Sequence, residues 1–247
     1  MAAVFMEVVA NLVGIANVTI LVLLLYAASL AAGWHVPGAY SNAQTHASAD
    51  VQAQSRKTSP PYTGDLSRFG GKDRARNLQV ERVMDLLAIK HGVAVADIGA
   101  GSGWFTVRAA RRTGTTGKVY AVDINPDFLQ HIRERAQQDG LHNIETILDE
   151  EDDPRLPANS VDSVLLLKTY HEIAKPVPFL KNLRKALRPG ARVGIIDRSG
   201  NGEDHGIDAA VVIDEARQAG LELHGQYDFV KADEGVEYFL VFTVRPN

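Results

Sequence analysis

Between residue 72 and the end of the chain, short apolar runs alternate with segments whose apolar residues recur every three or four positions. The short runs have the length and composition of buried strands, and the longer periodic segments are typical of helices with one buried face. The predicted strands are Val93–Ile98, Lys118–Val122, Ile144–Leu148, Val161–Leu167 and Arg192–Ile196. The predicted helices are Lys72–Ile89, Phe105–Arg112, Pro126–Asp139, Val177–Leu187 and Ile207–Ala219.

Regular alternation of strand and helix predicts a parallel sheet with helices on both of its faces. Two further strands are predicted near the C-terminus, at Leu221–Val230 and Val236–Val244. The segment between them is too short for a helical crossover, so we expect these two strands to be antiparallel neighbours. The chain therefore predicts an α/β fold with a mostly parallel sheet and one reversed strand.

The N-terminal part of the chain has a different composition. No Asp, Glu, Lys or Arg lies between Glu7 and Asp50, and the 25 residues Val8–Ala32 are mostly apolar. A helix of about 20 apolar residues crosses a hydrocarbon core of about 30 Å. We therefore predict a membrane anchor or signal segment over residues 1–33, a flexible linker over 34–66 and one globular domain over 67–247.

The sequence leaves two fates open for the N-terminal segment. It lacks the basic first region of a signal peptide, which favours an uncleaved anchor, but Ala47-Ser48-Ala49 has the small-residue spacing of a cleavage site. The first basic residues after the segment are Arg56 and Lys57, which favours a cytoplasmic C-terminal domain. The alternative is export after cleavage.

Composition excludes several kinds of site. The 247 residues include no cysteine, which excludes disulfides, thiolate zinc sites, iron–sulfur ligation and a cysteine nucleophile. There are 26 Lys and Arg against 30 Asp and Glu, and the net charge of -4 disfavours a nucleic-acid partner. No metal site is predicted.

The strongest chemical signal is a glycine loop at the end of the first predicted strand. In VADIGAGSGWFT, Asp97 is followed by Gly99, Gly101 and Gly103, and a helix begins directly after them. Glycines allow a tight turn and let a ligand approach the backbone closely. Trp104 stands where the dinucleotide-binding pattern requires its third glycine, and no Gly-Lys-Ser/Thr follows, which excludes a phosphate-binding P-loop.

VADIGAGSGWFT, together with KVYAVDINPDFL and LRKALRPGARVGIIDR, resembles class I S-adenosylmethionine-dependent methyltransferases over residues 79–245. The resemblance implies a Rossmann-like sheet of seven strands with the last strand antiparallel. It also implies S-adenosylmethionine as the cofactor, held by the glycine loop. This cofactor has no pyrophosphate, so the third glycine is not needed.

The resemblance implies a role for several acidic side chains. Asp123, at the end of the second strand, would accept the two ribose hydroxyls, and Asp97 would act near the methionine ammonium group. Ile124 would give the adenine an apolar face. An acid after the third strand would bind the adenine amino group; five consecutive acids compete there, and a gapless count favours Glu150.

The resemblance also implies that the acceptor meets the methyl group beyond the fourth strand, where Tyr170, His171 and Glu172 follow Lys168. The ordinary pKa of a histidine side chain suits a general base, and we expect His171 to take this role. Glu172 would orient His171 or act in its place. Tyr170 would close over the cofactor or bind the acceptor. Lys168 has no explanation from the sequence. The predicted activity is methyl transfer to a small-molecule or lipid-like acceptor.

Two alternatives to methyl transfer remain at this point. One is an S-adenosylmethionine-binding module that acts as a sensor or scaffold without transferring the methyl group. The other is a nicotinamide-dependent oxidoreductase, which Trp104 disfavours.

Overall fold

The computed structural model describes residues 55–58, 64–66, 70–71, 73–201, 205–233 and 235–244. The expected anchor at residues 1–33 and most of the expected linker lie outside these ranges. In the part that the structure describes, no helix has both the length and the apolar character needed to cross a membrane. The chain from Val51 to Asn247 forms one compact unit.

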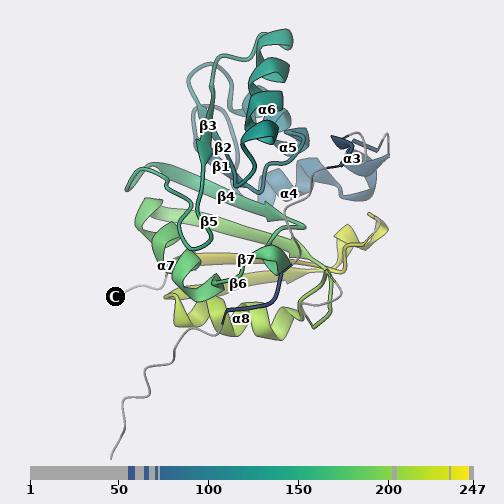
Figure 1. Cartoon of the computed structure of the whole chain (residues 1–247), viewed down its shortest axis with the longest axis vertical. Helices are drawn as coiled ribbons and strands as arrows, with labels where there is room; N and C mark the ends of the chain where they lie inside the picture. The colour runs from purple at the N-terminus through teal and green to yellow at the C-terminus, as the bar shows by residue number, and fades with distance from the viewer. Residues whose placement is uncertain are drawn as a thin grey trace, which may run out of the picture. The chain divides into compact units, whose positions relative to one another are not determined.

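A seven-stranded sheet forms the centre of this unit, with the strand order β3-β2-β1-β4-β5-β7-β6 (Figure 1). The neighbours β3, β2, β1, β4 and β5 are parallel, and β7 is antiparallel to both β5 and β6. The strands are β1 (Ala94–Ile98), β2 (Lys118–Asp123), β3 (Ile144–Leu148), β4 (Val161–Leu167), β5 (Leu187–Asp197), β6 (Leu221–Tyr227) and β7 (Tyr238–Val244). The mostly parallel sheet and its reversed last strand are thus confirmed.

Helices cover both faces of the sheet, and each face has its own apolar core. One core joins Met84 and Phe105 to strand residues such as Leu165, while the other joins Phe179 and Val212 to Val193. The first face carries α3 (Arg74–Asn77), α4 (Val80–Leu86), α5 (Trp104–Thr113) and α6 (Pro126–Gln138), and the second carries α7 (Pro176–Ala186) and α8 (Ala209–Gln218). Two short 3-10 turns, η3 (Tyr170–Glu172) and η4 (Phe229–Ala232), follow β4 and β6.

The first predicted helix, Lys72–Ile89, is wrong as a single element. The structure divides it into α3 and α4, because Gln79 between them adopts a left-handed conformation with φ of 50°. Leu78, Val83 and Leu87 are fully buried on both sides of this break. The apolar periodicity therefore predicted the buried side chains correctly. It does not reveal an interruption of the helix when the buried side chains stay on one face.

Two strand ends also differ from the prediction. β5 begins at Leu187 rather than Arg192, because Leu187 pairs with Val161 before a register shift in the β4–β5 ladder. β6 ends at Tyr227 because Phe229 turns away into η4, where its ring packs edge-on against Phe239 at a centroid distance of 6.1 Å.

The described segment at residues 55–58 packs against the second face. The Nη2 atom of Arg56 donates to both carboxylate oxygens of Glu215 on α8, at 2.7 Å each, and its Nη1 donates to the carbonyl of Tyr170 at 3.0 Å. The backbone N–H of Arg56 donates to the carbonyl of Ala174 at 2.7 Å. These contacts fix the segment beside the turn that follows β4.

Candidate functional site

The candidate site lies at the carboxyl ends of the parallel strands. In open α/β sheets, ligands bind where the strand order reverses, which in this sheet is between β1 and β4. Asp97, Asp123 and Asp197 stand at the ends of β1, β2 and β5, and all three are buried. Three buried carboxyl groups near one edge mark it as a site for chemistry rather than for packing.

The glycine loop after β1 is held tightly against its neighbours. The N–H groups of Gly99 and Ala100 both donate to the carbonyl of Val122, at 2.8 and 3.0 Å. Gly99 has φ of 68°, and a Cβ atom there would lie 2.3 Å from the side chain of Thr169. The loop after β1 therefore touches the segment after β4, and only glycine fits at the contact.

We expect Gly99→Ala to lower the free energy of unfolding by about 1–3 kcal/mol more than Gly140→Ala does. Both glycines have a left-handed φ, 68° and 65°, but a Cβ at Gly140 meets nothing within 4 Å. The control therefore isolates backbone strain, which costs about 1–2 kcal/mol in a residue with a side chain. Urea denaturation measures both variants, and equal losses would show that the contact with Thr169 is unimportant.

Asp123 connects the second strand to the glycine loop. Its Oδ2 atom accepts the N–H of Gly101 at 2.8 Å, and its Oδ1 accepts the N–H of Asn125 at 2.9 Å. Burial raises the pKa of Asp123 above its ordinary value, and these backbone donors oppose the rise. An ionised carboxylate has about four lone-pair sites, so its two oxygens can accept two more donors. Ile124 beside it is 45% exposed and offers an apolar surface.

Asp149, directly after β3, is the acid that lies beside Asp123. Its N–H donates to the carbonyl of Asp123 at 3.3 Å, and burial, followed by the charge of Asp123, raises its pKa to about 7. Among the described side chains, its Oδ1 is the one buried polar atom without a hydrogen-bond partner. Glu150, favoured by the sequence count, is exposed, and its Oε1 lies 3.6 Å from Nη1 of Arg155. The geometry therefore favours Asp149 over Glu150.

Asp97 is buried at the end of β1, where its Oδ2 accepts the hydroxyl of Thr106 at 2.6 Å. Burial raises its pKa to about 7, against the lowering effect of Thr106. The guanidinium of Arg74 lies over the ring of Trp104 at 4.7 Å and forms an ion pair with Asp233, with Nε 3.6 Å from Oδ2; it is also near enough to Asp97 for their charges to interact. Sequence reasoning missed Arg74, since a basic residue in a short segment rich in charged residues carries no distinguishing signal.

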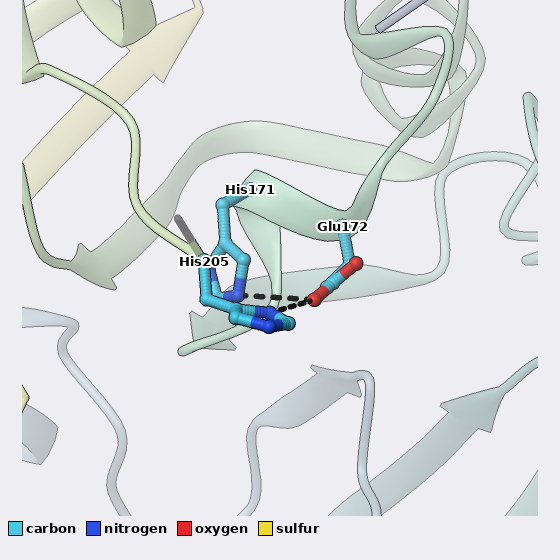
Figure 2. A group of neighbouring side chains, drawn as sticks. All are labelled: His171, Glu172 and His205. Carbon is cyan, nitrogen blue, oxygen red and sulfur yellow. Dashed lines mark hydrogen bonds and ion pairs between the residues drawn. The ribbon is translucent and has the colours of Figure 1, made fainter. Parts of the chain in front are cut away.

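A second group of polar side chains lies beyond β4 (Figure 2). His171 is buried, and its Nδ1 lies 2.8 Å from Oδ1 of Asp197, while its Nε2 faces Oε1 of Glu172 at 3.4 Å. His205, from the loop after β5, places its Nδ1 2.9 Å from the same Glu172 oxygen. The structure thus brings together His171 and Glu172, as expected. Asp197 was missed, although its position at a strand end is a signal of the same kind as that of Asp123.

The expected role of Tyr170 is not supported by its position. The side chain is fully buried in the core of the second face, and its hydroxyl donates to Oε2 of Glu215 on α8 at 2.8 Å. Tyr170 therefore supports the turn that carries His171 rather than closing over a cofactor. The preceding Lys168 adopts a left-handed φ of 56°, a strained conformation that turns the chain after β4.

Comparison with known sequences adds a family to this geometry. A family model described as a methyltransferase domain matches residues 89–220, which is more than half of the chain. The ubiquinone/menaquinone biosynthesis C-methyltransferase UbiE of Escherichia fergusonii is 26% identical over 136 residues, covering 55% of this chain and 53% of that protein. The chain thus spans about half the length of the curated relatives it matches.

Solved structures share the fold. A SAM-dependent methyltransferase from Aquifex aeolicus superimposes with a TM-score of 0.65 and 25% identity, covering 74% of this chain and all of that one. Fibrillarin of Aeropyrum pernix in complex with S-adenosyl-L-methionine gives a TM-score of 0.52 at 15% identity, covering 69% and 74%. The [4+2]-cyclase SpnF gives 0.59 at 15% identity, covering 75% and 86%.

Proposed function

Because the chain belongs to the methyltransferase domain family, we propose that it transfers the methyl group of S-adenosylmethionine to a small-molecule acceptor. The observation that carries the cofactor assignment is the unpartnered Oδ1 of Asp149 beside Asp123. A buried polar atom without a partner is costly unless a ligand supplies one. The adenosine part of the cofactor offers donors of the required kind: an amino group and two ribose hydroxyls.

Each part of the cofactor has a matching group at the edge of the sheet. Asp123 accepts the ribose hydroxyls, Asp149 the adenine amino group, and Ile124 lies against the adenine ring. The buried carboxyl group of Asp97 faces the ammonium of the methionine part, and Arg74 binds its carboxylate. When bound, the cofactor supplies a methyl group on a positively charged sulfur, which leaves as a neutral thioether.

The acceptor end is formed by His171, Glu172 and Asp197. The carboxylate of Asp197 bonds Nδ1 of His171 and fixes the orientation of the ring. When no cation is bound to Nε2, this nitrogen can take the proton of an acceptor hydroxyl or enol. Alignment of the acceptor with the methyl carbon supplies most of the remaining rate enhancement. A quinol-like or other lipid-soluble phenol is the first acceptor class to test, given the name of the curated relatives and the apolar N-terminal segment.

We also propose that the segment at residues 1–33 anchors the protein to a membrane with its catalytic domain in the cytoplasm, where S-adenosylmethionine is made. The alternative activity is cofactor binding without transfer. SpnF illustrates that this fold also occurs in a protein named as a cyclase, so the fold alone does not decide between them.

The experiment that tests the proposal incubates the full chain with S-adenosylmethionine and a panel of quinols, phenols and water-soluble enols. Formation of S-adenosylhomocysteine that depends on one acceptor class supports methyl transfer. Tight cofactor binding without turnover on any class favours the sensor or scaffold. Absence of cofactor binding by the folded protein would contradict both.

We expect cofactor binding to tighten as the pH rises from 5.5 to 7, by up to about tenfold per pH unit for each carboxyl group that ionises on binding. The pKa of Asp97 is raised to about 7 in the unliganded protein, so this group is mostly protonated at pH 6. The ammonium of the cofactor favours the ionised carboxylate, and binding therefore releases a proton. The free energy of unfolding of the unliganded protein shows the opposite trend. It decreases as the pH rises from about 4 to 7, because the pKa of Asp97 is higher in the folded protein than in the unfolded chain.

Calorimetry in two buffers with different ionisation enthalpies counts the protons released on binding. Asp97→Asn is expected to reduce that number by about one, whereas the exposed Asp127→Asn keeps it. A proton count that Asp97→Asn leaves unchanged would mean that Asp97 does not face the ammonium group.

A further inference from the structure

We propose that His171, Glu172 and His205 form a binding site for a divalent transition-metal ion such as Zn²⁺, at the acceptor end of the site. One nitrogen or oxygen of each residue lies within 4.8 Å of those of the other two (Figure 2). This departs from the sequence prediction, which included no metal site. The three residues come from two loops that only the fold brings together.

The distances between the ligand atoms fit a common ion. Two ligands at about 2.1 Å from one ion lie about 3.0 Å apart at a right angle and about 3.4 Å apart at a tetrahedral angle. Oε1 of Glu172 lies 2.9 Å from Nδ1 of His205 and 3.4 Å from Nε2 of His171. A small movement of His205, whose side chain is 61% exposed, completes the set.

Asp197 fixes His171 in the form that a metal ion requires. Its carboxylate is fully buried and accepts the backbone N–H of His171 at 3.2 Å as well as bonding Nδ1 at 2.8 Å. The Nδ1 proton is thereby directed at Asp197, and the lone pair of Nε2 points toward Glu172. A carboxylate behind a ligating histidine is the usual second partner in metal sites, because it sets the ring orientation and raises the basicity of the ligand.

Hydrogen bonds among the described residues of the loop after β5 hold the backbone of His205 in place. Ile207 N–H donates to the carbonyl of Arg198 at 2.8 Å, and Nε of Arg198 donates to the carbonyl of His205 at 2.9 Å. His205 itself has a left-handed φ of 59°, which is strained for a residue with a side chain.

The ligand types decide which ions fit. Two imidazoles and one carboxylate favour Zn²⁺, Co²⁺, Mn²⁺ or Fe²⁺, whereas Mg²⁺ and Ca²⁺ prefer sites made of oxygen atoms. Three protein ligands leave at least one coordination position open. On the proposed methyltransferase function, an acceptor hydroxyl or enol oxygen occupies that position and loses its proton to solvent, so that the ion takes over the task of Nε2 of His171.

The test uses the untagged full chain, stripped with a chelator and titrated with Co²⁺ and Zn²⁺, with Mg²⁺ as the control ion. We expect one Co²⁺ per chain with a visible absorption band, displaced by Zn²⁺ and not by Mg²⁺. Glu172→Gln and His205→Ala are expected to weaken Zn²⁺ binding at least about tenfold, and Asp197→Asn about 10–100-fold through the orientation of His171. The exposed His224→Ala on β6 keeps wild-type affinity.

Metal affinity that survives His205→Ala, or the absence of any Co²⁺ band, would overturn the site. Cofactor binding is measured by thermal shift on the same preparation, which separates the two proposals. Protein that binds S-adenosylmethionine but no transition metal disproves the metal site alone, whereas metal binding without cofactor binding counts against the proposed function alone.

Discussion

Asp123→Asn is expected to weaken S-adenosylmethionine binding about 100-fold. Two hydrogen bonds from the ribose to an ionised carboxylate are each worth about 1.5–3 kcal/mol, and an amide of the same shape replaces them only in part. A hundredfold loss corresponds to about 2.7 kcal/mol. The same change removes a negative charge that helps to raise the pKa values of Asp97 and Asp149. An amide also keeps only one acceptor oxygen for the N–H groups of Gly101 and Asn125, so the unliganded fold is expected to lose at most about 1–3 kcal/mol of its free energy of unfolding.

A large loss of affinity in a variant that remains folded separates a ligand-binding role from a structural one. Calorimetry gives the dissociation constant, and urea denaturation without cofactor gives the free energy of unfolding. Asp127→Asn makes the same change of charge on the exposed start of α6 and is expected to alter the dissociation constant less than about twofold. Loss of stability in Asp123→Asn with unchanged affinity would mean that Asp123 serves only to hold the N–H groups of Gly101 and Asn125.

The sheet was predictable because its strands are buried on both faces. Runs such as Val161–Leu167 are short and almost wholly apolar, and the observed bounds of β3 and β4 match the predicted ones. The first helix was mispredicted for a physical reason: a single left-handed residue, Gln79, redirects the chain without disturbing the apolar periodicity. The local apolar pattern predicts which side chains are buried, but it does not predict where a helix is interrupted.

The positions of site residues were predictable where those residues end a strand of the parallel sheet. Asp97 and Asp123 end parallel strands, so their positions at one edge follow from the fold. Asp149 and Glu150 are adjacent in sequence, and only the path of the loop after β3 decides which of them has a buried carboxylate oxygen and lies near the charge of Asp123. Asp197 ends β5 and could have been placed in the same way as Asp123, whereas the contact between His205 and Glu172 depends on the path of the loop after β5.

The acceptor end carries the second large expected effect. His171→Gln is expected to lower kcat about 100-fold or more while changing the dissociation constant of S-adenosylmethionine less than about twofold. Glutamine retains an N–H donor for the buried carboxylate of Asp197, so the substitution removes the imidazole without leaving that charge unpaired. His142→Ala, an exposed histidine before β3, is the control and is expected to retain full turnover.

The variant Asp197→Asn then distinguishes how His171 acts. An amide at this position does not hold the Nδ1 proton as the carboxylate does, so His171 loses its fixed orientation. If Nε2 takes the acceptor proton directly, we expect kcat of Asp197→Asn to fall about tenfold or more at every metal concentration, because no ion replaces the misdirected base. If a bound ion activates the acceptor, the variant's deficit is one of ion affinity, and saturating Zn²⁺ restores turnover. Full activity of both His171→Gln and Asp197→Asn would leave alignment of the acceptor as the sole source of catalysis.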